Sequence, residues 1–323
     1  MKKHLSLLLV LLLLVSCFTA CEPKSPVDPN TTPQGDPTVR IGYFSGTTGI
    51  GMAKMISDAD PAYSFTKYEG TTYIAAALQN GELDIAAYPT QGVPALDNTV
   101  EGGVQYLAIN TLGVLYLCTN GIMLSSLSEL SGKTVYVPEP APGKVLEYIL
   151  AQNGITDVNI QMSSLTALPE LIVSGENDVQ IALLPEPKVT AAQLSAQSAG
   201  NTSFAVSPID LTEEWNKVSD TPLVQGCVVV RSDFAAAHPD LVEWFLSVYR
   251  ASISYIANAE NLESAAEMVV NAGILPKAAI AKIAIPRSNI TYLAGEDMRQ
   301  AVTGFLTAFG SDYRSEGYYL PKS

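Results

Sequence analysis

Short apolar runs alternate with amphipathic stretches along the chain from about residue 38. The first run, residues 38–44 (TVRIGYF), is typical of a buried strand and precedes a helical stretch over 50–58. A strand around 64–68, a helix over 71–80, and a turn with a strand over 81–88 follow. Strands that alternate with helices predict a parallel sheet built from βαβ units.

The same order of elements returns 94 residues further along the chain. The motif Gly81-Glu82-Leu83-Asp84-Ile85 matches Gly175-Glu176-Asn177-Asp178-Val179 at this offset. The other matching segments are a strand over 133–137, a loop over 138–143, a helix over 144–152, a strand over 158–162 and a helix over 167–174. Several elements at one offset indicate two βαβαβ lobes rather than a chance match.

Two apolar segments are predicted to connect these lobes and to act as a hinge beside a cleft. We expect the first part of lobe 1 over 38–118, lobe 2 over 119–221, and a return to lobe 1 with C-terminal helices over 222–323. Cys118 and Cys227 fall in the two connecting strands, which would run side by side. They are interpreted as two buried thiols or, less favoured, a disulfide.

The N-terminus has the pattern of an export signal. Lys2 and Lys3 precede an apolar stretch of 12 residues, which is too short to span a bilayer. Its end, Leu14-Val15-Ser16-Cys17, resembles the bacterial lipobox, which implies cleavage after residue 16 and acylation of Cys17, with Cys21 as the alternative. Residues 17–37 are rich in proline and predict an extended tether. We therefore expect an extracytoplasmic protein that is lipid-anchored to the bacterial cell membrane.

Composition and charge exclude several functional classes. The chain carries 18 Lys and Arg against 32 Asp and Glu, a formal charge of −14, so binding to nucleic acid is not expected. Only two histidines are present, His4 and His238. A histidine-rich metal site is excluded, and the commonest general base is nearly absent. We expect no cofactor, no catalytic residues and no enzymatic activity.

The ordered set of motifs resembles a known family, the extracytoplasmic solute-binding proteins of ABC importers. The group includes nitrate-, sulfonate- and thiamine-precursor-binding proteins, and the resemblance covers residues 38–323. The stretches that carry it are 45–51, 81–90, 107–117, 127–137, 183–187 and 226–239. The resemblance implies a type II periplasmic-binding-protein fold, a monomer whose two lobes close on a solute, and delivery to a membrane permease with its ATPase.

Candidate ligand residues follow from the rule that ligands bind beyond the carboxyl ends of the strands in open α/β sheets. Glycines allow close backbone approach there, and hydroxyls add hydrogen-bond partners. In the first lobe these residues are Ser45, Gly46, Thr47, Thr48, Gly49, Pro89, Thr90, Asn110 and Thr111; in the second they are Glu139, Pro185 and Glu186. Tyr43, Tyr68 and Tyr88 are candidates for a stacking wall.

The charged residues leave the solute open. Arg287 and the other arginines are placed away from the cleft, and only Lys144 and Lys188 adjoin candidate loops. Nitrate, a sulfonate, a pyrimidine-like compound or another small organic molecule all fit. Two other functions share the fold: a sensor that presents its closed form to a receptor, and, less favoured, an enzyme.

Overall fold

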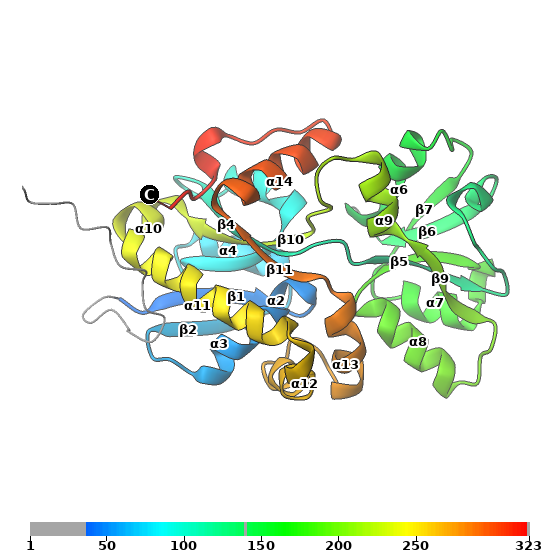
Figure 1. Cartoon of the computed structure of the whole chain (residues 1–323), viewed down its shortest axis with the longest axis horizontal. Helices are drawn as coiled ribbons and strands as arrows, with labels where there is room; N and C mark the ends of the chain where they lie inside the picture. The colour runs from blue at the N-terminus through cyan, green and yellow to red at the C-terminus, as the bar shows by residue number, and fades with distance from the viewer. Residues whose placement is uncertain (1–36, 139–140, 322–323) are drawn as a thin grey trace, which may run out of the picture.

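The computed structural model describes residues 37–138 and 141–321, which form two α/β lobes joined through the middle of the molecule (Figure 1). The predicted signal peptide, Cys17, Cys21, the tether up to residue 36, and Glu139 lie outside the described residues. No described helix combines the length and the apolar character that a membrane span requires.

The first lobe is built on a six-stranded sheet with the order β11-β4-β10-β3-β1-β2. Strand β1 runs parallel to β2 and β3, whereas β10 is antiparallel to its neighbours β3 and β4. The strands are β1 (Val39–Phe44), β2 (Tyr63–Tyr68), β3 (Ile85–Pro89), β4 (Val104–Thr111), β10 (Gly226–Arg231) and β11 (Ile290–Ala294).

The second lobe is built on a five-stranded sheet with the order β7-β6-β8-β5-β9. Here β6 runs parallel to β7 and β8, and β5 is antiparallel to β8 and β9. The strands are β5 (Leu115–Asn120), β6 (Thr134–Pro138), β7 (Asn159–Ser163), β8 (Ile181–Pro185) and β9 (Phe204–Asp210).

The two sheets repeat one topology. The order β2-β1-β3-β10-β4 in the first corresponds to β7-β6-β8-β5-β9 in the second. The prediction of two α/β lobes is confirmed, but the sheets are mixed rather than purely parallel. Strand β10 in the first sheet and β5 in the second are each antiparallel to both neighbours. Each directly follows a crossing from the other lobe, so the chain enters the sheet from the opposite end.

Helices cover both faces of each sheet, and the alternation of the strands decides which core each side chain joins. Val39, Ile41 and Tyr43 of β1 are buried against Trp244 and Phe245. The helices of the first lobe are α2 (Thr47–Ile50), α3 (Ala53–Asp58), α4 (Thr71–Gln79), α5 (Val93–Asp97), α10 (Ser232–Ala237), α11 (Pro239–Ala257), α12 (Leu262–Asn271), α13 (Ala278–Arg287) and α14 (Gly295–Ala308). Those of the second are α6 (Ala141–Gln152), α7 (Leu168–Ser174), α8 (Lys188–Ser198) and α9 (Leu211–Val218).

The first crossing lies earlier than predicted. Strand β4 ends at Thr111 and β5 already pairs within the second sheet from Leu115, so 115–118 belong to lobe 2 rather than lobe 1. The apolar run conceals this crossing because both strands are buried. Cys118 in β5 and Cys227 in β10 therefore lie in different sheets, not side by side. Both are free, buried thiols, the favoured of the two interpretations.

Both sides of the hinge carry packing between the lobes. On one side the rings of Phe305 and Phe309 in and after α14 meet Trp215 of α9, with centroids 5.7 and 5.9 Å apart. Phe309 also contacts Tyr148 of α6, at 5.9 Å. On the other side α13 packs on α8, and both helices lie at the bottom of Figure 1. The C-terminal helices thus brace the second lobe as well as the first.

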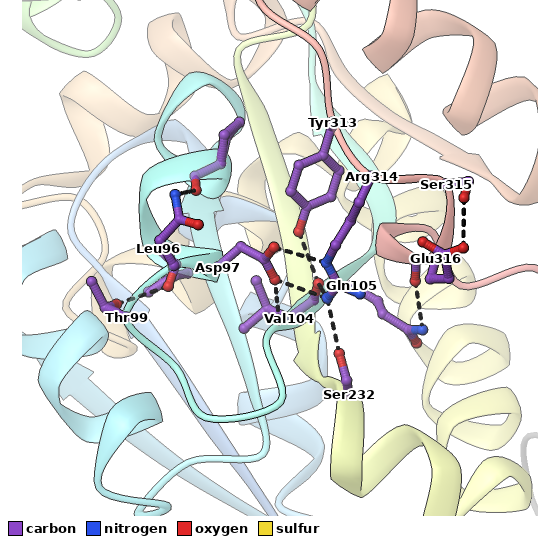
Figure 2. A network of polar contacts seen from close by, with 12 residues as sticks. Leu96, Asp97, Thr99, Val104, Gln105, Ser232, Tyr313, Arg314, Ser315 and Glu316 are labelled. Carbon is purple, nitrogen blue, oxygen red and sulfur yellow. Dashed lines mark hydrogen bonds and ion pairs between the residues drawn. The ribbon is translucent and has the colours of Figure 1, made fainter.

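The C-terminal segment is fastened to the first lobe by one polar network (Figure 2). Arg314 donates two hydrogen bonds of 2.8 Å to Asp97 and a further one to the carbonyl of Val104. The Tyr313 hydroxyl donates to the same carbonyl, and Gln105 donates to the carbonyl of Glu316. Because Val104 begins β4, the network attaches the segment after α14 to an inner strand of the sheet.

Candidate functional site

A cavity of about 1290 Å³ lies between the lobes, at the carboxyl ends of their parallel strands. Its wall includes Phe44 at the end of β1, Pro89 at the end of β3, Pro138 at the end of β6 and Pro185 at the end of β8. Both lobes therefore contribute to one site. Its position is that of ligand sites in open α/β sheets.

The loop after β1 provides the polar part of the first lobe's wall. Ser45, Gly46, Thr47 and Thr48, four of the candidate ligand residues, line the cavity. Gly46 has a φ of 122°, a conformation that only glycine adopts easily. Its amide donates to the carbonyl of Ile274, 3.2 Å away, and the Ser45 hydroxyl donates to Gly273 at 3.4 Å. These bonds attach the loop to the segment that follows α12.

The helix after this loop is shorter than predicted. Instead of one helix over 50–58, the chain forms the four-residue α2 and then α3. Gly49 is buried outside the cavity wall, and a Cβ at this position would lie 2.7 Å from the Phe44 carbonyl. Gly49 therefore allows α2 to pack closely on β1. It does not line the cavity, so it is not positioned to contact a solute.

Strand β3 brings Tyr88 and Pro89 to the cavity but not Thr90. Thr90 is fully buried, its amide donates to Gln225 and its carbonyl accepts from Tyr106. Tyr88 is the one stacking candidate that lines the cavity, and burial raises the pKa of its hydroxyl. The other two candidates, Tyr43 and Tyr68, do not line the cavity. Tyr43 is buried, and its hydroxyl donates to the carbonyl of Ala272.

Asn110 and Thr111 lie behind the wall rather than in the cleft. The Asn110 amide donates to the Thr48 carbonyl at 3.0 Å and to the Tyr249 hydroxyl at 2.9 Å. Thr111 is fully buried and donates to Asn110. The hydrogen bonds of these two polar residues in an otherwise apolar strand attach α2 to β4. They therefore position the loop that carries Thr48.

In the second lobe Pro185 and Glu186 line the cavity. The side chain of Glu186 is fully buried, and its Oε1 accepts from Thr190 at 2.9 Å. Arg287 of α13 places its Nε 3.2 Å from the same oxygen. Burial raises the pKa of Glu186, although Thr190 and Arg287 act to lower it. Its Oε2 is buried without a hydrogen-bond partner.

Arg287 is not among the residues that line the cavity, but it lies directly behind Glu186, which does. Its guanidinium also lies over the Tyr116 ring, 4.9 Å from the centroid, and donates to Gln193 of α8. No local pattern predicts this arrangement, because it depends on how α13 packs against the second lobe.

Further wall residues lie outside the set of candidate ligand residues. Lys67, Lys144 and Lys188 line the cavity, and two of them adjoin loops singled out from the sequence. Gln91 and Gln225 also line it. Apolar residues of α14 and of the segment around α13 complete the wall, namely Phe305, Leu306, Phe309, Ile274, Leu275, Pro276 and Ile280.

His238, the histidine within the described residues, lies away from the cavity. His238 lies at the start of α11, with its ring 5.0 Å from Phe234, and is not part of the cavity wall. Within the described parts of the chain, no group of three or more His, Cys, Asp and Glu side chains is arranged to hold a metal ion.

Comparison with known proteins gives one family and many structural neighbours. A family model described as NMT1/THI5 like matches residues 64–261, which is more than half of the chain. No curated protein matches the sequence.

Similar solved structures share the two-lobed architecture. An ABC transporter protein from Parabacteroides distasonis has a TM-score of 0.66 and 19 % identity, covering 89 % of this chain and 98 % of the other. The periplasmic aliphatic sulphonate binding protein SsuA from Escherichia coli has a TM-score of 0.67 and 14 % identity, covering 89 % and 94 %. The ligand binding component of an ABC-type import system from Staphylococcus aureus has a TM-score of 0.67 and 13 % identity, covering 88 % and 97 %. At these identities the likeness concerns the fold.

Proposed function

The chain belongs to the NMT1/THI5-like family, and from this premise we propose that it is a solute-binding protein that captures a small molecule in its interlobe cleft and delivers it to an ABC-type import permease. The family assignment agrees with the resemblance seen in the sequence motifs. The proposal is supported by structural neighbours that are named as an ABC transporter, as the ligand binding component of an ABC-type import system and as a sulphonate binding protein.

The observation that carries this proposal is the composition of the cavity wall from both lobes. Ser45 to Thr48 and Tyr88 face the cavity from the first lobe, and Lys144, Pro185 and Lys188 from the second. A solute that contacts both walls stabilises the arrangement in which they are close. Binding therefore couples to closure, which is the signal that a permease needs in order to distinguish loaded from empty protein.

Binding without chemistry fits the groups around the cavity better than catalysis does. The acidic side chain of the wall, Glu186, is held by Arg287 and Thr190 rather than beside a nucleophile. A solute is then held and released unchanged.

The anchor is a separate part of the proposal. The lipobox-like sequence before Cys17 supports acylation of this residue, or of Cys21, and the proline-rich residues that follow support a tether. We place the folded lobes outside the cytoplasm, within reach of the permease and its ATPase. Mass spectrometry of the mature N-terminus tests this directly, since it identifies the acylated cysteine.

The experiment for the binding function is a thermal-shift screen of the purified chain against small sulfonates, nitrate, pyrimidines, amino acids and aromatic carboxylates. A solute at a hundred times its dissociation constant adds about 2.7 kcal/mol to the unfolding free energy, which raises Tm by several degrees. Substitution Thr48→Val should abolish the shift. A folded protein that responds to no solute and retains none on purification would refute the proposal.

A further inference from the structure

The cavity wall carries positively charged side chains although the chain as a whole is acidic. Lys67, Lys144 and Lys188 line it, while the whole chain carries a formal charge of −14. Among the described residues, no carboxylate lies within ion-pair distance of these three lysines. The lysines thus bring positive charge to the wall of this cavity on an acidic protein, and within residues 37–138 and 141–321 that charge has no ion-paired carboxylate.

Glu186 does not offset these lysines. Among the described residues it is the one acid that lines the cavity, but its side chain is fully buried and paired with Arg287. The Arg287 guanidinium opposes the charge of the Glu186 carboxylate within the protein. Of the described wall residues, the lysines therefore carry the charges that a solute can reach.

The lysines belong to both lobes. Lys67 is in β2 of the first lobe, and its amino group lies close to Gly273 in the segment between α12 and α13. Lys188 begins α8 and Lys144 lies in the first turn of α6, both in the second lobe. A negative group between the lobes attracts both walls, and the attraction is stronger inside a cleft than in open water.

The size and the remaining surface of the cavity require more than a bare inorganic anion. At about 1290 Å³ the cavity exceeds even the range usual for drug-sized ligands, so nitrate alone would leave most of the space to water. Phe305, Leu306 and Phe309 form an apolar surface along α14, and Ile274, Leu275 and Ile280 form another near α13. Removing such apolar surface from water stabilises a complex, and this requires a solute with an apolar part that covers it.

Building on the function proposed above, we infer that the solute is an organic anion with an apolar body, whose negative group is met by Lys67, Lys144 and Lys188. A lysine ammonium is a compact charge that does not demand the two-pronged geometry of an arginine. Carboxylate, sulfonate and phosphate groups are all compatible with such a set. The apolar surfaces then select for the body, and the lysines for the charge.

The test uses matched probes that differ in one property. Hexanoate, hexanesulfonate and hexyl phosphate carry the negative group, hexanamide is neutral, hexylammonium is positive, and acetate with methanesulfonate lacks the body. Calorimetric titration of the purified full chain should show binding of at least one six-carbon anion. We expect its affinity to be at least tenfold above that of its short analogue and of the neutral and positive probes. Its affinity should also fall as salt is raised.

Variants separate the lysines from general electrostatics. Lys188→Gln and Lys67→Gln should each weaken binding of the six-carbon anion by about three- to tenfold, equivalent to about 0.7–1.4 kcal/mol. Lys133→Gln, which removes an exposed lysine outside the cavity wall, should leave the affinity unchanged. Thermal unfolding of each variant checks that the fold is intact.

The outcomes distinguish this inference from the proposed function. Tight binding of a neutral or positive probe, or of a co-purified neutral or positive compound, would overturn the inference while the binding function stands. Equal affinity in Lys188→Gln, Lys67→Gln and Lys133→Gln would also overturn it. If no probe binds and native mass spectrometry detects no co-purified compound, both the inference and the proposed function fail.

Discussion

Arg287 and Glu186 form an ion pair that joins the two lobes, with Nε of the arginine 3.2 Å from Oε1 of the glutamate. The arginine ends α13, which packs on the first lobe, and the glutamate follows β8 of the second. Next to this pair, the amide of Asn289 donates to the carbonyl of Gly113 in the first crossing, at 2.5 Å. Residues 287–289 thus form a non-covalent third link beside the two chain crossings.

Removing the arginine should destabilise the protein. Arg287→Gln leaves the buried Glu186 carboxylate without its cationic partner, and losing one member of a buried pair costs about 3–5 kcal/mol. Because Arg287 itself is 27 % exposed, we expect a smaller loss, about 1–3 kcal/mol, in the free energy of unfolding. Urea denaturation measures it. The double variant Arg287→Gln/Glu186→Gln should recover part of the loss; no recovery would show that the pair does not carry the effect.

The same pair predicts a pH dependence with a definite sign. Burial raises the pKa of Glu186 in the folded state above that of an unfolded glutamate. The folded protein therefore holds this proton more tightly, and this residue's contribution to stability falls as pH rises through the window just above about 4.3. In Arg287→Gln the folded pKa rises further, so the loss of stability should be larger at pH 7 than at pH 4.5. An equal loss at both values would contradict this account of Glu186.

Trp215 should report solute binding. The chain has two tryptophans, Trp215 and Trp244. Trp215 stacks on Phe309, which lines the cavity, whereas Trp244 stacks on Tyr63 in the core of the first lobe. Binding should change the emission of wild-type protein and of Trp244→Phe, but not of Trp215→Phe. If the change instead disappears in Trp244→Phe, the packing around α14 does not respond to the solute.

Asn110 should affect binding without touching the solute. Asn110→Ala removes the donor to the Thr48 carbonyl and leaves buried partners unsatisfied, which costs about 1–3 kcal/mol of stability. The loop from Ser45 to Thr48 loses its support, so we expect affinity to fall at least fivefold at a temperature where the variant is folded. Asn271→Ala, an exposed position in α12, is the control. Unchanged affinity in Asn110→Ala would show that the loop is positioned by other contacts.

The network of Figure 2 should contribute stability of the opposite pH sign. Burial acts to raise the pKa of Asp97, but hydrogen bonds from Arg314 and Val104 outweigh it and lower this pKa. The stabilisation is therefore present above the unfolded pKa of about 3.9 and is lost as pH falls below it. Asp97→Asn should lower the unfolding free energy by about 1–2 kcal/mol at pH 7. The difference should shrink towards pH 3, and a constant difference would contradict the assignment.

The sequence was informative where short-range rules apply. The repeat at an offset of 94 predicts two lobes, and the loop from Ser45 to Thr48 lies on the cavity wall because the end of a strand determines its place. Asn110 is a candidate ligand residue by its place at the end of a strand, but it does not line the cavity. In the structure its partners are buried backbone and the Tyr249 hydroxyl.

Other features depend on contacts between distant segments. The Arg287–Glu186 pair links residues about a hundred positions apart, and only the packing of α13 on α8 brings them together. The sequence places the first crossing at too high a residue number for a similar reason. Strands β4 and β5 form one nearly continuous apolar stretch, and only their pairing in different sheets separates them. Patterns along the chain predict elements, but not which sheet a buried strand joins.

Native mass spectrometry of the protein purified from its host tests the central claim most directly. The account predicts a one-to-one complex with a small molecule that is released on unfolding. Ser45→Trp, which places a large ring in the cavity, should lack the complex, whereas Ser195→Trp on the exposed side of α8 should retain it. A small molecule that stays bound equally well in Ser45→Trp would contradict a solute site in the interlobe cleft.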